Sequence, residues 1–192
     1  MSNMNVTDKR PSLSIVVLAY QAGESIVQFL TVLKNDLKTA GIDDFQIVLV
    51  ANYHATDPSD QTANIAHNLA RADPRIKVIA EVKMGMMGWD AISGLNAASG
   101  DAIALIDGDG QMDLKLIKYF IDPIISKKAG FTKGNRFSDF TFIKNMPTIR
   151  IIGNILFSMI GIIITKNIKI FDFLNGYPSI DNKALKKVLK KN

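Results

Sequence analysis

Short apolar runs alternate with longer segments of mixed polarity between residues 13 and 106. Two of the runs, 13–18 and 47–50, have the length and apolar character of strands that are buried on both faces, and the runs 76–80 and 102–106 repeat this pattern. Three longer segments between them have the character of helices: 25–40, 59–72 and 89–98. This alternation predicts an α/β domain with a mostly parallel central sheet and helices on both of its faces.

The longest apolar stretch lies further on, at residues 151–165, where Asn154 and Ser158 interrupt it. It falls short of the roughly 20 residues that a membrane-spanning helix needs. Two interpretations therefore stay open. The stretch is either a helix buried against the sheet or a helix lying in a membrane interface, with Arg150 and Lys166 at its ends as anchors.

Composition and charge narrow the class of protein. A chain of 192 residues is long enough for one domain, and the absence of cysteine excludes disulfides and thiolate metal sites. Residues 1–10 are polar and the apolar run after them is too short for a signal peptide, so we expect a cytoplasmic protein.

The net charge of +5 comes entirely from the end of the chain, because five lysines and no acidic residue lie within residues 183–192. We therefore expect no nucleic-acid partner. The predicted organisation is a polar tail at 1–12, one domain at 13–182 and a basic tail at 183–192. That tail is either a short amphipathic helix for an anionic membrane or a solvated end.

The most informative polar motif follows the fourth apolar run directly. Asp107 and Asp109 stand two residues apart, with Gly108 and Gly110 beside them. Open α/β sheets bind ligands at the carboxyl ends of their strands, and two carboxylates suit a hard divalent ion that also binds phosphate oxygens. The alternative is an ordinary Asp-Gly turn on the surface.

This motif and several others, in the same order, resemble family-two glycosyltransferases, which have the GT-A fold of nucleotide-diphospho-sugar transferases. Residues 107–111 are similar to the Asp-x-Asp metal element of that family. Other segments match the family pattern along the chain from 13 to 185: 18–26, 51–57, 83–101, 133–137, 146–154 and 170–177. The last three of these look like the acceptor half of bacterial enzymes that make polysaccharides or polyprenyl-linked sugars.

The resemblance implies transfer of a sugar from a nucleotide-diphospho-sugar to a lipid-linked or saccharide acceptor, at the cytoplasmic face of a membrane. It implies Mg²⁺ or Mn²⁺ as cofactor, held by Asp107 and Asp109. The residues implied on the donor side are Ala19, Tyr20, Glu24, Asn52, Lys83, Asp107 and Gly108. Those implied on the acceptor side are Gln111, Asn135, Arg136, Asn175 and Gly176.

The sequence also departs from the family pattern. Ala22 stands where the opening motif usually has an acid, and Ala51 and Asn52 replace an acidic pair. The family usually continues beyond the segment around Tyr177 with a helix that often supplies the general base, so we name no base. A truncated, inactive member that binds at most a nucleotide is therefore the alternative. A nucleotidyltransferase is less favoured, because no basic glycine-rich loop follows Leu18.

Overall fold

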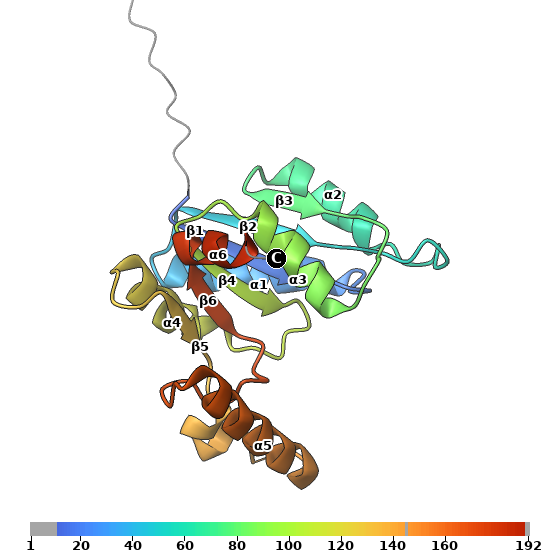
Figure 1. Ribbon diagram of the computed structural model, residues 1–192. Coiled ribbons are helices and arrows are strands. Elements are labelled where there is room, and N and C mark those ends of the chain that lie inside the picture. Colours follow the sequence, from blue (N-terminus) through green and yellow to red (C-terminus); the bar gives the residue numbers. More distant parts are fainter. Residues whose placement is uncertain (1–10, 145, 191–192) are drawn as a thin grey trace, which may run out of the picture.

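The structure, a computed structural model, describes residues 11–144 and 146–190. Its centre is a sheet with the strand order β3-β2-β1-β4-β6-β5 (Figure 1). The strands are β1 Leu13–Leu18, β2 Phe45–Val50, β3 Ile76–Ile79, β4 Ala102–Asp107, β5 Phe131–Lys133 and β6 Pro178–Asp181. The first four are parallel, as predicted, and their bounds lie within two residues of the predicted ones. β6 pairs antiparallel with β4 and with β5, and neither β5 nor β6 is predicted from the sequence.

Helices cover both faces of this sheet. Five helices do so: α1 Ser25–Thr39, α2 Thr62–Ala72, α3 Met87–Ala97, α4 Ile117–Ile125 and α6 Asn182–Leu189; a sixth, α5 Thr148–Thr165, lies apart from the sheet. Three single 3₁₀ turns are η1 Leu114–Leu116, η2 Arg136–Ser138 and η3 Phe140–Phe142. Residues of α1, α2 and α4 share one apolar core with the sheet, and residues of α3 and α6 share a second core on the opposite face. The predicted two-sided arrangement is therefore confirmed.

Every residue of β1 is buried, which explains its continuous apolar sequence. Ile15 and Val17 belong to the core under α1, and Val16 to the core under α3. Helix α3 packs closely on this second face, because Gly94 has no side chain: a Cβ there would lie 2.7 Å from Cγ2 of Val50. Apolar burial on both faces is what a central strand of a two-sided sheet requires.

The chain segment that carries the basic residues near the end forms α6 rather than a free tail. The Asp181 carboxylate accepts hydrogen bonds from the backbone N–H groups of Lys183 (3.0 Å) and Ala184 (3.1 Å), which begins the helix. Leu185 is buried against the sheet and Leu189 packs beside it. The apolar side of α6 is thus used inside the domain, and its lysines point outwards. Lys191 and residues 1–10 lie outside the described residues.

Helix α5 lies apart from the sheet layers, at the far end of residues 134–177, which connect β5 to β6 and are called the arm here (Figure 1). Only 11% of α5 is buried, so the interpretation as a helix buried against the sheet is wrong. Within the described residues it is the one helix whose length and composition would allow it to cross a membrane, with a mean hydropathy of 1.9. The arm leaves and rejoins the sheet at one point, where the Gly134 N–H donates to the Tyr177 carbonyl (3.0 Å).

Candidate active site

The candidate site lies at the carboxyl edge of the parallel strands. The strand register aligns Leu18 at the end of β1 with Val50 of β2 and with Asp107 of β4, so the loops that follow these strands begin side by side. The Gly108 N–H donates to the Leu18 carbonyl (2.8 Å), and a Cβ at Gly108 would lie 2.9 Å from the same oxygen. A glycine at this position is therefore what lets the carboxylate loop turn tightly against β1.

Asp107 and Asp109 occupy different environments within this loop. Asp107 is half-buried, and burial, followed by the nearby charge of Asp109, raises the pKa of its carboxyl group. Asp109 is exposed, and one of its carboxylate oxygens accepts the Gln111 N–H (2.9 Å). Gly110, which lies between Asp109 and Gln111, has a φ of +74°, a left-handed conformation that favours glycine.

These two carboxylates fit a divalent cation that completes its ligand set with phosphate oxygens. Their mutual repulsion is the kind of electrostatic cost that a cation between them would remove. Across residues 11–144 and 146–190, no group of three His, Asp or Glu side chains is close enough to hold a metal ion on its own, without further oxygen atoms from a bound substrate. Mg²⁺ and related hard ions are commonly held by one or two carboxylates together with substrate phosphates.

A cleft of about 420 Å³ opens beside the carboxylates, between their loop and helix α1. It is lined by residues that include Gly108, Asp109, Met112 and Phe29. A second cleft of about 400 Å³ lies at the start of α1, and Glu24 lines it together with Gln21 and Asp57. Glu24 therefore faces a different opening from the one that Asp109 lines.

Three loops bring Tyr20, His54 and Lys83 together at the same edge of the sheet. The Tyr20 ring is 44% exposed, with the Lys83 ammonium 4.4 Å from its centre and the His54 ring edge-on at 5.8 Å between centroids. An exposed aromatic ring held in this way offers a flat apolar surface for a planar ligand. Lys83 also forms an ion pair with Asp90, and both side chains are almost fully buried.

Asn52 and Ala19 lie deeper than Tyr20. The Asn52 side chain is buried, and its amide group donates to the Asp90 carboxylate (2.8 Å) and accepts the Glu81 N–H (2.9 Å). Both polar ends of this amide are thus occupied within the domain. Ala19 is buried as well, and its N–H continues the sheet by donating to the Val50 carbonyl (2.8 Å).

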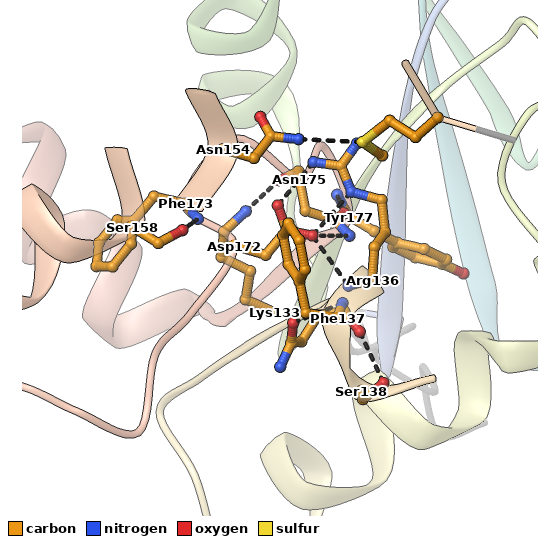
Figure 2. A network of polar contacts seen from close by, with 12 residues as sticks. Lys133, Arg136, Phe137, Ser138, Asn154, Ser158, Asp172, Phe173, Asn175 and Tyr177 are labelled. Atoms are coloured by element: carbon orange, nitrogen blue, oxygen red, sulfur yellow. Dashed lines mark hydrogen bonds and ion pairs between the residues drawn. The ribbon is translucent and has the colours of Figure 1, made fainter. Parts of the chain in front are cut away.

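Of the acceptor-side residues of the sequence analysis, Gln111 lies in the carboxylate loop, and the other four lie at the two ends of the arm, where Figure 2 shows Arg136 and Asn175. Gly176 approaches the carboxylate loop so closely that a Cβ on it would lie 3.2 Å from Oδ2 of Asp107. Asn175 accepts the Tyr177 N–H with its side-chain oxygen (2.9 Å), and Asn135 accepts the Phe137 N–H (3.0 Å). These asparagines stabilise turns at the two ends of the arm, and the turn of Asn175 lies next to Asp107 through Gly176.

Arg136 is held by a buried carboxylate, that of Asp172. The Asp172 side chain is fully buried and accepts Nε (2.8 Å), Nη2 (2.7 Å) and the backbone N–H (2.9 Å) of Arg136. This bidentate pair raises the pKa of Arg136. Next to it, burial lowers the pKa of Lys133, whose ammonium donates to the Asn175 carbonyl. The planar fork of Arg136 thus binds the protein's own carboxylate.

Comparison with known proteins agrees with this arrangement. Residues 14–189 match the sequence profile of the family described as Glycosyl transferase family 2. The chain belongs to this family. A search of curated proteins by sequence finds no significant match.

Two solved structures show the same fold at low identity, and a third is similar over part of the chain. The mannosyltransferase PcManGT from Pyrobaculum calidifontis, in complex with GDP-Man and Mn²⁺, has a TM-score of 0.54 and 14% identity over 94% of this chain and 47% of its own. A 4-diphosphocytidyl-2C-methyl-D-erythritol synthase from Anaerococcus prevotii has a TM-score of 0.50 and 13% identity over 94% and 77%. TarS from S. aureus is 26% identical over 58% of this chain and 19% of its own, with a TM-score of 0.42.

The family 2 domain thus has the predicted GT-A fold, and it spans less than half the length of PcManGT and of TarS. Sequence reasoning missed Asp90 and Asp172, the two buried carboxylates that hold Lys83 and Arg136. For Asp172 a signal was present, since it lies three residues before Asn175 in a segment that resembles the family. Nothing in the sequence alone pairs it with Arg136, which lies 36 residues earlier.

Proposed function

We propose that this chain transfers a sugar from a nucleoside diphosphate sugar to a lipid-linked or saccharide acceptor. In this proposal it acts at the cytoplasmic face of a membrane, in the synthesis of a cell-envelope polysaccharide or glycolipid. The observation that carries the proposal is the pair Asp107 and Asp109 at the carboxyl edge of the sheet, in a chain of glycosyl transferase family 2. The similar mannosyltransferase that binds GDP-Man and Mn²⁺ supports this choice of donor class.

Asp107 and Asp109 would hold Mg²⁺ or Mn²⁺, and a bound ion would offset the negative charge that grows on a diphosphate leaving group. The exposed ring of Tyr20 would stack on the nucleoside base, with the Lys83 ammonium held beside it. Gly176 packs closely against Asp107, so an acceptor held by this end of the arm would lie next to the carboxylate loop and would meet the sugar there. The contribution of this chain is thus to bind and orient both substrates.

Calorimetric titration of the full chain with GDP, UDP and their sugar conjugates, with and without Mn²⁺, tests this function. We expect binding that requires the metal. Replacement Asp109→Asn removes one charged ligand and is expected to weaken metal-dependent binding at least about tenfold. Asp101→Asn is the matched control, because Asp101 is exposed and precedes the same strand at its opposite end.

Absence of nucleotide binding in the folded protein would contradict the proposal. Binding without any donor hydrolysis or sugar transfer would instead support the alternative of an inactive family member. That alternative is motivated by Asn52, which stands where the family has an acid and whose amide is occupied by Asp90 and the Glu81 N–H.

A further inference from the structure

The polarity of helix α5 is inverted relative to a helix on a water-facing surface. Its two buried residues are polar, Asn154 (4% exposed) and Ser158 (0%). Its exposed apolar side chains are Ile149, Ile152, Ile155, Leu156, Phe157, Met159, Ile160, Ile163 and Ile164. They cover an arc of about 200° at 3.6 residues per turn. A helix that faces water has the opposite arrangement, with apolar residues inwards and polar ones outwards. The outer face of α5 therefore suits an apolar surrounding.

The inner face of α5 is occupied by the arm itself. The Ser158 hydroxyl accepts the Phe173 N–H (3.3 Å), and the Asn154 amide donates to the Met146 sulfur (3.5 Å; Figure 2). A Cβ at Gly161 would lie 2.6 Å from the Phe173 ring, so the ring packs directly on the helix backbone. These contacts fix which side of the helix faces outwards.

The charges around α5 favour a lipid surface with anionic headgroups as this surrounding. Residues 140–171 carry four cations and no acidic residue. Lys144 and Arg150 lie near the start of α5, Lys166 and Lys169 lie at and beyond its end, and all four are exposed. We propose that the outer face of α5 docks on an anionic bilayer, with these cations among the headgroups. Each cation near such a surface contributes about 1 kcal/mol, a factor of about five in affinity.

The backbone of the arm shows how deep the helix would lie. After Lys166, residues 167–177 return towards the sheet without forming a helix or strand, and Phe173 lies against α5 on the way. Hydrocarbon cannot satisfy the N–H and carbonyl groups of such irregular backbone. A spanning α5 would carry this segment into the membrane core. The proposal is therefore a helix in the plane of the interface, with only its outer face in contact with acyl chains.

Docking in this orientation has a consequence for the acceptor. Both ends of the arm meet at the candidate site, where the Gly134 N–H donates to Tyr177 and Gly176 approaches Asp107. A docked arm thus holds the carboxylate edge near the headgroups, within reach of an acceptor that is itself a lipid. This step deepens the proposed function and rests on it, whereas docking itself does not require any transfer activity.

Flotation of the full chain with vesicles tests the proposal. We expect binding to phosphatidylglycerol–phosphatidylcholine vesicles, and at least about tenfold weaker binding to phosphatidylcholine alone. The charge variant Arg150→Gln/Lys166→Gln/Lys169→Gln removes three cations and should therefore bind anionic vesicles about 100-fold more weakly. Its control neutralises three exposed lysines of α6, as Lys183→Gln/Lys186→Gln/Lys187→Gln, and should bind much more tightly than the arm variant.

A second variant removes the apolar contact, as Leu156→Ser/Ile160→Ser/Ile163→Ser. Its control is Ile92→Ser/Tyr119→Ser, at two exposed apolar side chains (50% and 77%) outside the arm. The arm variant should float at least about tenfold less, and the control should match the parent chain. Because all five side chains are exposed, both variants should melt like the parent.

Several results would overturn the proposal. The first is absence of binding to anionic vesicles, and the second is an equal loss of vesicle binding in the arm variants and their controls. The third is membrane association that survives alkaline extraction, which is the behaviour expected of a spanning helix. A concentration-dependent dimer that the apolar arm variant abolishes would assign the face to a second copy of the chain. Nucleotide binding measured without vesicles separates the docking proposal from the proposed transferase function, because the arm variants should bind nucleotide like the parent chain.

Discussion

The buried pair of Asp172 and Arg136 should hold the root of the arm together. Burial alone would raise the pKa of Asp172, but the hydrogen bonds and charge of Arg136 outweigh it and bring the pKa below its usual value, so the carboxylate is ionised. The replacement Asp172→Asn keeps the size of the side chain and removes the charge. Residue 172 has a φ of +55°, a left-handed conformation that asparagine adopts readily, so backbone strain does not contribute.

Breaking a buried ion pair by neutralising one partner costs about 3–5 kcal/mol. The Arg136 side chain is 22% exposed, which lets water solvate part of the orphaned cation, so we expect a loss of about 3 kcal/mol. Urea unfolding followed by circular dichroism measures this loss. If the arm opens while the rest of the domain stays folded, hydrogen exchange of the α5 amides measures the lost free energy instead.

The matched control is Asp122→Asn, which breaks the surface pair of Asp122 with Lys118 (3.3 Å), where both side chains are about half exposed. It should change the unfolding free energy by less than about 0.5 kcal/mol. Adding Arg136→Met to Asp172→Asn removes the orphaned cation and should restore part of the loss. The reasoning is refuted if Asp172→Asn costs less than about 1 kcal/mol by both methods, or if the double variant is less stable than the single one.

Two further predictions concern the packing of α3 and the carboxylate loop. Gly94→Ala places a Cβ 2.7 Å from a Val50 methyl and should lower the free energy of unfolding in urea by about 1–3 kcal/mol. Gly88→Ala, on the open side of the same helix, should leave this free energy unchanged or raise it. Equal effects of the two variants would contradict the packing argument. Because the pKa of Asp107 is raised, its carboxylate takes up a proton at a higher pH than an ordinary aspartate does. As the pH falls, Mn²⁺-dependent nucleotide binding should therefore weaken at a correspondingly higher pH. In an NMR titration without metal, Asp109→Asn should lower the Asp107 midpoint because one cause of the shift is removed, and an unchanged midpoint would show that burial alone sets it.

The parallel half of the fold could be predicted from the sequence because three of its four strands, β1, β2 and β4, are largely buried on both faces. A strand of this kind is a continuous apolar run, such as residues 13–18, and needs no knowledge of its neighbours to be recognised. β5 and β6 have three and four residues, and Pro178 begins β6. Strands this short carry too little periodicity to be distinguished from loops.

The arm shows a different limit of sequence reasoning. An apolar helix predicts burial, but it does not say whether protein or lipid covers it. The polar residues Asn154 and Ser158 interrupt the apolar stretch in the sequence, and only the structure shows that they face inwards. The side-chain partners at the site escaped prediction for a related reason. The pair of Arg136 and Asp172 depends on where two distant segments meet.

The antiparallel placement of β6 beside β4 has a consequence for how such domains can diversify. Because the arm leaves after Lys133 and returns at Pro178, which are paired in the register of β5 and β6, its length and sequence are free of the sheet's register. The arm, which would face the acceptor in the proposed function, can therefore vary without changing the pairing of the strands. Strands β1 to β4 would keep their packing as long as Tyr177 is retained, since Tyr177 belongs to the first core and no residue of α5 belongs to either core. Under the proposed function, selection on acceptor choice and selection on nucleotide binding would thus act on separate stretches of sequence.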